Sequence, residues 1–488
     1  MADYDLAIIG GGLNGVSLAR DAAGRGLRVI LLEQGDLGAG ASSASPRLIH
    51  GDLDMLERAA LLRVRGALTE RDIWLRTAPH LVRPMRFAIP ALSDEQPPWL
   101  LRAWLLLYDR LGCSRRLPAS VTLDVTHHPT GNALKRSFGT AFEYSDCVVD
   151  DSRLVIAVAV DAAERGADIR TGARCVRADR LDIWRLAVID RGQRRVITAR
   201  TLANASGAWT ASVAETVLRV PPPDLGVTNV SQIIVRRLFD SGNVYVFQNT
   251  DRRRIFVSPY ERDFTLIGSV RQPFKGDPAV VTTTAADIAY LCDAASRYFR
   301  ERVQPSDVIK TVSGLETVAG PASPRAAHEG VVTFDASPRA APLLTVFGGD
   351  ATTSRRRAER AVSRLTQFYP MSRRWTAKAP LPGGNFAWTR LDAEVDRARA
   401  RWRFLTEPNA QRLVAAYGMR LEAILGNAGS PADLGPGFGP ELSGAEVRYL
   451  MKREWARFPD DVLWRRSKLG LTMPPQDREA LAAFMATA

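Results

Sequence analysis

The sequence is poor in the residues that build disulfide frameworks and metal sites. Its 488 residues include four cysteines and five histidines. The cysteines, Cys113, Cys147, Cys175 and Cys292, occur singly, and no Cys-x-x-Cys or His-Glu-x-x-His spacing is present. These absences argue against a disulfide-stapled secreted domain and against a metal site. We therefore expect a reducing, cytoplasmic location and no metal.

The sequence also lacks an apolar run long enough to cross a membrane. The most apolar stretch, 97–108, is interrupted by Arg102 and is shorter than the roughly 18 apolar residues that a span needs. Residues 1–12 lead directly into a buried strand, so we expect no signal peptide. Residues 99–111 could form a helix with one apolar and one basic face. This leaves two alternatives, peripheral contact with the inner face of a membrane or packing of the helix on its own domain.

Positive charge is abundant but dispersed. The net charge is +13 and the hydrophobic content is 46%, which suits a globular chain of two or three domains. The excess is mostly arginine distributed along the whole chain, for example at 252–254 and 355–357. Because this charge is spread along the chain and does not mark one binding segment, we predict no nucleic-acid partner.

The N-terminal residues form a strand–turn–helix pattern typical of dinucleotide binding. Residues 4–9 read as a buried strand, and the following helix is expected to end near Arg25. Gly10 permits the tight turn, Gly12 allows close approach of a pyrophosphate, and Gly15 allows the helix to pack on the strand. The helix N-terminus, which includes Asn14, can then face phosphates with free N–H groups.

A second strand, 27–32, ends at Glu33, whose carboxylate could accept both ribose hydroxyls of an adenosine. These features together predict a dinucleotide site. They do not distinguish NAD from FAD as the dinucleotide.

Three later segments favour FAD. Residues 40–45 include Ser42 and Ser43, which can donate hydrogen bonds to a pyrophosphate, and the chain then passes His50. Residues 202–209 include Ala205 and Gly207 and read as a strand and turn near the cofactor. Residues 346–353 include Gly349, Asp350 and Thr352 and read as a strand, a glycine turn and a second helix start. Such a helix N-terminus commonly points at the flavin edge that gains negative charge on reduction.

Several segments together resemble the flavin-dependent glycerol-3-phosphate dehydrogenases. They occur in the family's order over nearly the whole chain, and they are IIGGGLNGVSLARDAAGRGLRVILLE, SSASPRLIHG, APHLVRPMRFAIP, FEYSDCVVDDSRLV, FKGDP, APLLTVFGG, GNAG, PADLGPGFGPEL and DDVLWRRSKLGL. The resemblance implies FAD as cofactor and a two-dinucleotide-binding-domain α/β flavoprotein with a Rossmann-like FAD domain, an inserted antiparallel β substrate domain and a C-terminal helical domain. The expected ranges are 1–90, 140–212 and 315–370 for the FAD domain, 91–139 and 213–314 for the substrate domain, and 371–488 for the helical domain.

The resemblance fails at positions expected to line the substrate pocket. Asp54 and Glu316 stand where the family has arginines, and Asp350 stands where it has a lysine beside the flavin. Two unit charges about 4 Å apart interact by roughly 4 kcal/mol at an effective dielectric near 20, so these reversals should prevent binding of a phosphate dianion. Two alternatives would weaken the effect of these charge reversals. Arg271 could pair with Glu316 or Asp54 or form a relocated anion site, and Asp350 could cap the following helix.

Three functions follow from this pattern. The first is an active dehydrogenase for a small hydroxyl-rich or amine-bearing substrate, with hydride transfer to the flavin and proton removal by His50 or Glu316. The second is oxidation of glycerol 3-phosphate with a relocated phosphate site. The third is a flavin-binding protein with little catalysis. The resemblance implies a quinone at a membrane as electron acceptor, but oxygen and a soluble carrier remain open as acceptors. The oligomeric state is also open, and a homodimer is one alternative.

Overall fold

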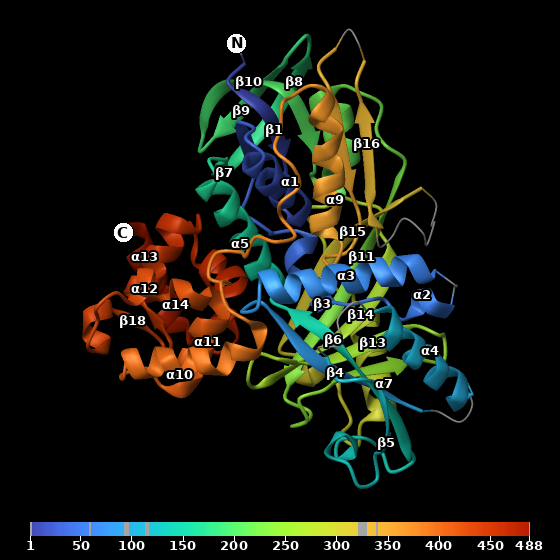
Figure 1. Cartoon of the computed structure of the whole chain (residues 1–488). Coiled ribbons are helices and arrows are strands. Elements are labelled where there is room, and N and C mark those ends of the chain that lie inside the picture. Colours follow the sequence, from blue (N-terminus) through green and yellow to red (C-terminus); the bar gives the residue numbers. More distant parts are fainter. Residues whose placement is uncertain are drawn as a thin grey trace.

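The chain folds around two large sheets with a helical unit at its C-terminal end (Figure 1). The computed structural model describes residues 2–57, 60–91, 97–112, 117–320, 329–337 and 340–487. Within these residues no helix is long and apolar enough to cross a membrane. The side chain of Asp54 lies outside the described part, so its predicted role stays a prediction.

The first sheet is built on the predicted N-terminal motif. Its hydrogen-bonded strand order is β16-β17-β10-β1-β2-β7, and β8 and β9 extend it beside β10. The strands are β1 (Tyr4–Ile9), β2 (Val29–Glu33), β7 (Asp168–Thr171), β8 (Ala173–Arg180), β9 (Trp184–Asp190), β10 (Gln193–Asn204), β16 (Val331–Asp335) and β17 (Leu343–Phe347). β1 pairs in parallel with both β2 and β10. Such central parallel strands are buried on both faces, which explains their continuous apolar sequence.

Three helices cover the first sheet. They are α1 (Leu13–Gly24), α5 (Asp151–Glu164) and α9 (Ser354–Val362), and α1 contacts both of the others. Small residues of α1, including Ala19 and Ala22, are fully buried and let these helices approach closely. The elements predicted at 4–9, 10–25 and 27–33 are confirmed, although the helix ends at Gly24 and the second strand begins at Val29.

The second sheet is largely antiparallel and forms the opposite wall of the molecule's central cavity. Its order is β15-β11-β14-β13-β12-β4-β6-β3, with β5 beside β6, and the β12–β4 pair is parallel. The strands are β3 (Leu48–Ile49), β4 (Val82–Pro90), β5 (Val121–Asp124), β6 (Thr140–Val149), β11 (Leu225–Arg236), β12 (Val244–Gln248), β13 (Arg254–Tyr260), β14 (Phe264–Pro273) and β15 (Lys310–Ala319). α7 (Ala285–Tyr298) packs on this sheet and buries a cluster of aromatic rings.

The predicted helix at 99–111 is present as α4 (Pro98–Leu111). It packs with α2 (Asp54–Glu57) and α3 (Leu61–Thr77) beside the second sheet (Figure 1). Tyr108 and Leu105 face inward and are buried, whereas Trp99 is 70% exposed. The helix is therefore amphipathic, as its sequence indicates.

The C-terminal unit contains α10 (Leu391–Arg401), α11 (Glu407–Tyr417), α12 (Leu421–Leu425), α13 (Gly444–Arg453) and α14 (Pro475–Thr487), with a small ladder of β18 (Gly437–Phe438) and β19 (Leu442–Ser443). The short helix α6 (Thr210–Ser212) lies outside this unit. Buried ion pairs fasten the C-terminal unit to the part of the molecule that contains the first sheet. Glu454 binds Arg153 of α5, and Asp36, which follows β2, binds both Arg465 and Arg466. The sequence pattern of 446–457 also predicts a helix, and α13 covers its first part, ending at Arg453.

Candidate active site

A cavity of about 700 Å³ lies between the two sheets. One end is lined by Glu33 and Arg174, and the other by His50 and Arg254. Its walls come from turns that follow β1, β2, β10 and β17 and from strands β13, β14 and β15. This long shape, open along the carboxyl ends of parallel strands, suits an extended dinucleotide followed by a small substrate.

The glycine turn after β1 is shaped by close backbone contacts. Gly10 has φ +110°, and a Cβ atom there would lie 2.5 Å from the Ala205 carbonyl oxygen. A Cβ atom on Gly15 would lie 1.9 Å from the Gly10 carbonyl oxygen, so Gly15 serves the packing of α1 and does not line the cavity. Gly12 does line it, and its absent side chain keeps the space beside Ser42 clear. Larger residues would fill the turn.

Glu33 closes one end of the cavity. Its two carboxylate oxygens accept hydrogen bonds from the backbone N–H groups of Gly11 at 2.6 Å and Gly35 at 2.8 Å. Burial raises the pKa of Glu33, and these two hydrogen bonds oppose that rise. The carboxylate is thus fixed where an adenosine ribose would lie.

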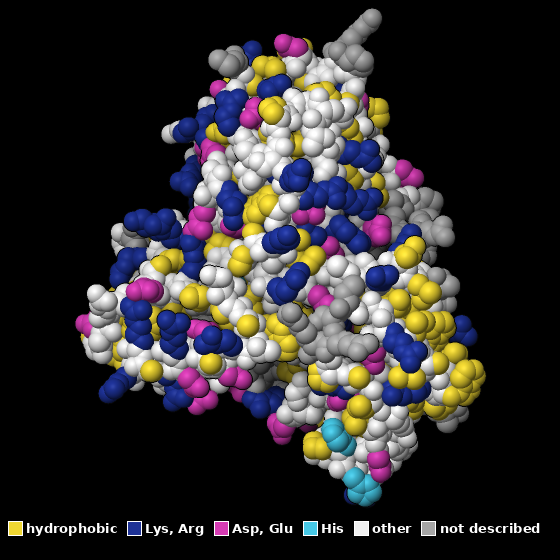
Figure 2. Space-filling model, viewed as in Figure 1, with side chains coloured by type: hydrophobic (Ala, Val, Ile, Leu, Met, Phe, Trp, Pro, Cys, Tyr) yellow, Lys and Arg dark blue, Asp and Glu magenta, His cyan; other side chains and the backbone are white. Residues whose placement is uncertain are grey.

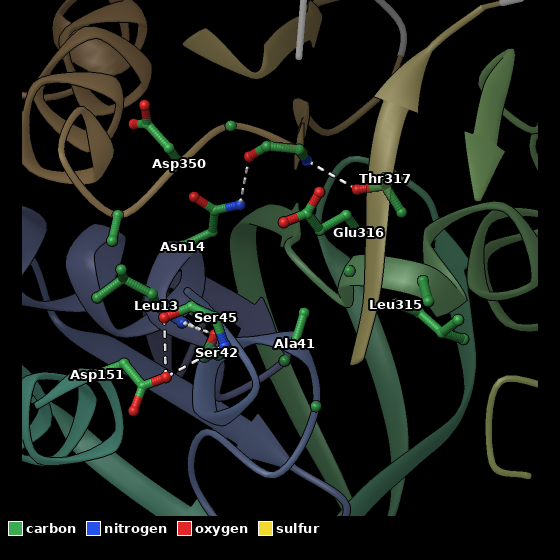
Figure 3. A pocket seen from close by; sticks show the side chains of 18 of the residues that line it. Leu13, Asn14, Ala41, Ser42, Ser45, Asp151, Leu315, Glu316, Thr317 and Asp350 are labelled. Carbon is green, nitrogen blue, oxygen red and sulfur yellow. Dashed lines mark hydrogen bonds between the residues drawn. The ribbon is translucent and has the colours of Figure 1, made fainter. Parts of the chain in front are cut away.

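The serines after residue 40 have different positions. The Ser42 hydroxyl lines the cavity and accepts a hydrogen bond from the Leu13 backbone N–H at 3.0 Å (Figure 3). Ser45, which the sequence reasoning did not single out, also lines the cavity and donates to Asp151 at 2.8 Å. Ser43 instead donates to the Gly40 carbonyl at 3.3 Å and does not line the cavity, although it belongs to the same 3-10 turn as Ser42.

Two further turns complete the dinucleotide wall. Ala205, Gly207 and Gly349 line the cavity, and both glycines have positive φ angles. Asn14 lines it as well, but its amide donates to the Gly348 carbonyl and accepts from Arg357 (Figure 3). Asn14 therefore ties the first glycine turn to the last one.

His50 lies on the cavity wall between the two sheets. Its backbone N–H donates to the Thr352 hydroxyl at 3.1 Å, and the next N–H, of Gly51, donates to the Tyr108 hydroxyl at 2.7 Å. Thr352 is fully buried and positions His50 without lining the cavity itself. Tyr108 in turn donates to Asp146, whose pKa is raised by burial and held down by Arg71 and His50.

Asp350 lines the cavity and stabilises the turn that leads into α9. Its carboxylate accepts hydrogen bonds from the Thr353 backbone N–H at 2.9 Å and hydroxyl at 2.7 Å, and Thr353 is the residue before the helix. In Figure 3 the Asp350 carboxylate points toward α9 and away from Asn14 and Glu316. Its charge is therefore directed toward the start of the helix and not toward Glu316.

Glu316 lies on β15 and its carboxylate points into the cavity (Figure 3). It pairs with Arg271 of β14, whose Nε lies 3.2 Å from a Glu316 oxygen. Arg271 also donates to the Ser269 hydroxyl at 3.0 Å. The two charges offset each other, so the expected excess of negative charge at this position is not present.

An arginine and a carboxylate at this end of the cavity were missed by the sequence reasoning. Arg254 and Asp52 both line the substrate end of the cavity, beside the rings of Phe256 and Tyr144. Burial lowers the pKa of Arg254 and the Asp52 charge opposes this. The available signal was the period-two pattern of β13, which places Arg254 and Phe256 on one face.

The geometry fits FAD. The wall would hold adenosine with Glu33 and Gly35, the pyrophosphate with the Gly10–Gly12 turn and Ser42, and the flavin between the Gly349 turn and His50. Gly12 supplies a test of the fit, since a Cβ atom there would lie 3.2 Å from the Ser42 Oγ, on the wall where the pyrophosphate would lie. α1 begins at Leu13 with Gly12 as its N-cap residue, so its N-terminal dipole faces the cavity, and the Leu13 N–H is bound by the Ser42 hydroxyl.

Comparisons with known proteins agree with this geometry. The family model "FAD dependent oxidoreductase" matches residues 5–355, and "C-terminal domain of alpha-glycerophosphate oxidase" matches residues 374–488. The chain is 40% identical to a glycerol-3-phosphate dehydrogenase of Pseudomonas aeruginosa, covering 99% of this chain and 95% of that protein. It is 39% identical to a D-erythritol 1-phosphate dehydrogenase of Brucella abortus, covering 98% and 97%.

A solved structure gives the same result for the fold. The glycerol-3-phosphate dehydrogenase of Bacillus halodurans, complexed with FAD, superposes with a TM-score of 0.77 at 22% identity over 99% of this chain and 90% of that one. This confirms the fold class expected from the sequence. The chain therefore belongs to the FAD-dependent oxidoreductases of the glycerol-3-phosphate dehydrogenase family.

Proposed function

We propose that the protein oxidises a CH–OH group of a small polyol that carries no phosphate. The observation behind the proposal is the ion pair of Arg271 with Glu316 at the substrate end of the cavity, where Arg254 and Asp52 also line the wall. These two arginines and two carboxylates offer donors and acceptors with little net charge. Vicinal hydroxyls can use both kinds of partner, whereas a phosphate dianion needs cations that are not already paired.

His50 is the proposed proton acceptor. When bound, FAD supplies the acceptor for the hydride leaving the CH–OH carbon. The hydroxyl proton must leave as the carbonyl forms, and His50 lies on the cavity wall with its backbone held from both sides. Glu316 is less suited to this task because its carboxylate is engaged by Arg271.

An amine-bearing substrate has less support. An ammonium group would need a carboxylate to pair with, but Glu316 pairs with Arg271, Asp52 acts on Arg254, and Asp350 accepts from Thr353. Within the described side chains of the cavity, each of these acidic groups thus has a partner. We therefore do not extend the proposal to amines.

A phosphorylated polyol is the second candidate. Two observations favour it: Arg254 and Arg271 both line the substrate end, and the relatives are named for glycerol 3-phosphate and D-erythritol 1-phosphate. A phosphate would have to displace Glu316 from Arg271. The exchange recovers less energy than binding to an unpaired cation, by the roughly 0–1 kcal/mol that a partly exposed ion pair contributes.

Anaerobic reduction of the FAD-loaded protein distinguishes these candidates. We expect erythritol or another short polyol to bleach the flavin absorbance, with xylitol and glycerol as further trials. Bleaching by amino alcohols and not by polyols would overturn the proposal. Failure of every alcohol, amine and phosphate would instead favour a flavin-binding protein with little catalysis.

We further propose that α4 contacts an anionic membrane surface, where a quinone could accept electrons. Large apolar side chains are exposed around its N-terminal half, since Trp99 is 70% and Leu62 of α3 is 85% exposed. Arg102 and Arg110 lie on the same helix. Co-sedimentation with anionic vesicles should be lost on Trp99→Glu together with Leu62→Glu, and unchanged sedimentation would contradict this proposal.

A further inference from the structure

A second cavity, of about 270 Å³, lies on the outer side of α9. Its lining residues are Glu329, Gly330, Val332, Arg357, Arg360, Ser363, Arg364 and Arg374. Four of these side chains are arginines, and Glu329 is the acidic residue among them. Figure 2 shows Lys and Arg side chains gathered over α9 on this face.

The positive charge of this cavity is poorly compensated. Glu329 lies 3.6 Å from Arg360 and 3.8 Å from Arg356, distances too long for direct hydrogen bonds. Within the residues that the structure describes, no carboxylate lies within 4.0 Å of Arg364 or Arg374. Arg374 donates to the Ser363 hydroxyl instead, at 3.3 Å.

The arrangement of arginines along the helix is unfavourable without a ligand. Arg356, Arg360 and Arg364 follow at intervals of four residues from α9 into its 3-10 extension. Like charges at this spacing face one another and destabilise a helix. An oxyanion between them would replace repulsion with charge-assisted hydrogen bonds.

Arg357 connects this cavity with the FAD cavity, since it lines both. Its buried guanidinium donates to Asn14 at 2.8 Å, to the Glu329 carbonyl at 3.1 Å and to the Asp350 carbonyl at 3.0 Å. Burial, together with the charges of Arg356 and Arg360, lowers the pKa of Arg357 to about 10. An anion near Arg357 would therefore stabilise a cation that also touches the flavin-binding turns.

We propose that the outer cavity is an oxyanion site for a phosphate or phosphomonoester group, held by Arg360, Arg364 and Arg374 and coupled to the FAD site through Arg357. The ligand is a soluble one. The exposed apolar residues Trp99 of α4 and Leu62 of α3, which could enter a membrane, do not line this cavity.

The test is a titration of the FAD-loaded protein with inorganic phosphate. Binding is measured by calorimetry and by the visible difference spectrum of the flavin. We expect saturable binding with a change in the flavin spectrum. Arg360→Gln and Arg364→Gln should each weaken binding by about tenfold or more, since each removes a charge-assisted hydrogen bond. Arg373→Gln is the matched control, because Arg373 is exposed next to the cavity without lining it.

Arg271→Gln separates the two cavities and should leave phosphate binding unchanged. The proposal is overturned if phosphate gives no saturable binding, if Arg360→Gln and Arg364→Gln bind like Arg373→Gln, or if Arg271→Gln abolishes binding. An unchanged flavin spectrum on saturation would refute the coupling through Arg357. Sedimentation with phosphatidic-acid vesicles through the same arginines, without binding of free phosphate, would refute a soluble ligand.

Discussion

The acidic residues that replace expected cations are held in local interactions. Glu316 is balanced by Arg271, and Asp350 accepts from Thr353, the residue before α9. A sequence comparison detects the change in charge at each position but not the partner that compensates it. Glu316 and Asp350 do line the cavity, with these partners, and the role of all three acidic residues, Asp54 included, stays a prediction.

Asp350→Ala should reduce stability more than it reduces substrate affinity. The loss of two hydrogen bonds at the start of α9 should lower the free energy of unfolding by about 1 kcal/mol. Urea unfolding of the FAD-loaded protein measures this, with Asp350→Asn as the conservative control. A lower turnover at unchanged unfolding midpoint would show instead that Asp350 contacts the substrate.

Glu316→Gln should shift preference toward phosphorylated polyols. The substitution keeps the shape of the side chain but leaves Arg271 without its counter-charge. We expect kcat/KM for a polyol phosphate to rise by about tenfold relative to the unphosphorylated polyol, which corresponds to about 1.4 kcal/mol. Steady-state kinetics with both substrates measure the ratio, and an unchanged ratio would contradict the assigned pairing.

At the scale of elements, motifs with strong backbone requirements were predictable. The strand–glycine turn–helix at 4–24 appears as expected because Gly10 and Gly15 leave no space for side chains. The run 255–259 reads as a strand in the sequence, whereas the structure begins β13 one residue earlier, at Arg254. The sequence reasoning therefore left Arg254 out of the strand and out of the pocket. Strand ends are set by tertiary pairing, which local sequence does not encode.

α4 is linked to the active site through one tyrosine. Tyr108→Phe removes the acceptor of the Gly51 N–H and the donor to Asp146, leaving both buried. We expect a loss of about 1–3 kcal/mol in stability and a lower kcat, because His50 precedes Gly51. Unfolding and turnover measurements test this, with Tyr290→Phe as the control because its hydroxyl binds exposed Asp251. Equal effects of both substitutions would contradict the link.

At the scale of the whole molecule, the order of α/β motifs indicated the architecture, but the contacts between units did not follow from sequence. His80 is an example. It is buried, and Gly383 and Gly418 of the C-terminal segment pack against its ring. These residues are more than 300 positions away in the chain, so no local pattern connects them.

His80 should make this packing sensitive to acid. Burial lowers the pKa of His80 from 6.5 to about 3, so the folded state favours the neutral ring. The folded state is stabilised in full above pH 6.5, where the ring is neutral in both states, and this stability is lost as pH falls toward 3. The free energy of unfolding should be lower by about 2–3 kcal/mol at pH 4 than above pH 6.5 for this reason. Unfolding between pH 7 and 4 should be less pH-dependent in His80→Gln. His127→Gln, at an exposed histidine, should retain the wild-type slope.

The central claim is that paired charges in front of the flavin favour an unphosphorylated polyol. The most direct measurement is the anaerobic rate of flavin bleaching by erythritol and by erythritol 1-phosphate at equal concentrations, followed by stopped-flow absorbance. The account predicts faster bleaching by erythritol. Faster bleaching by the phosphate ester would show that Arg254 and Arg271 bind a phosphate despite their carboxylate partners, and would contradict the proposal.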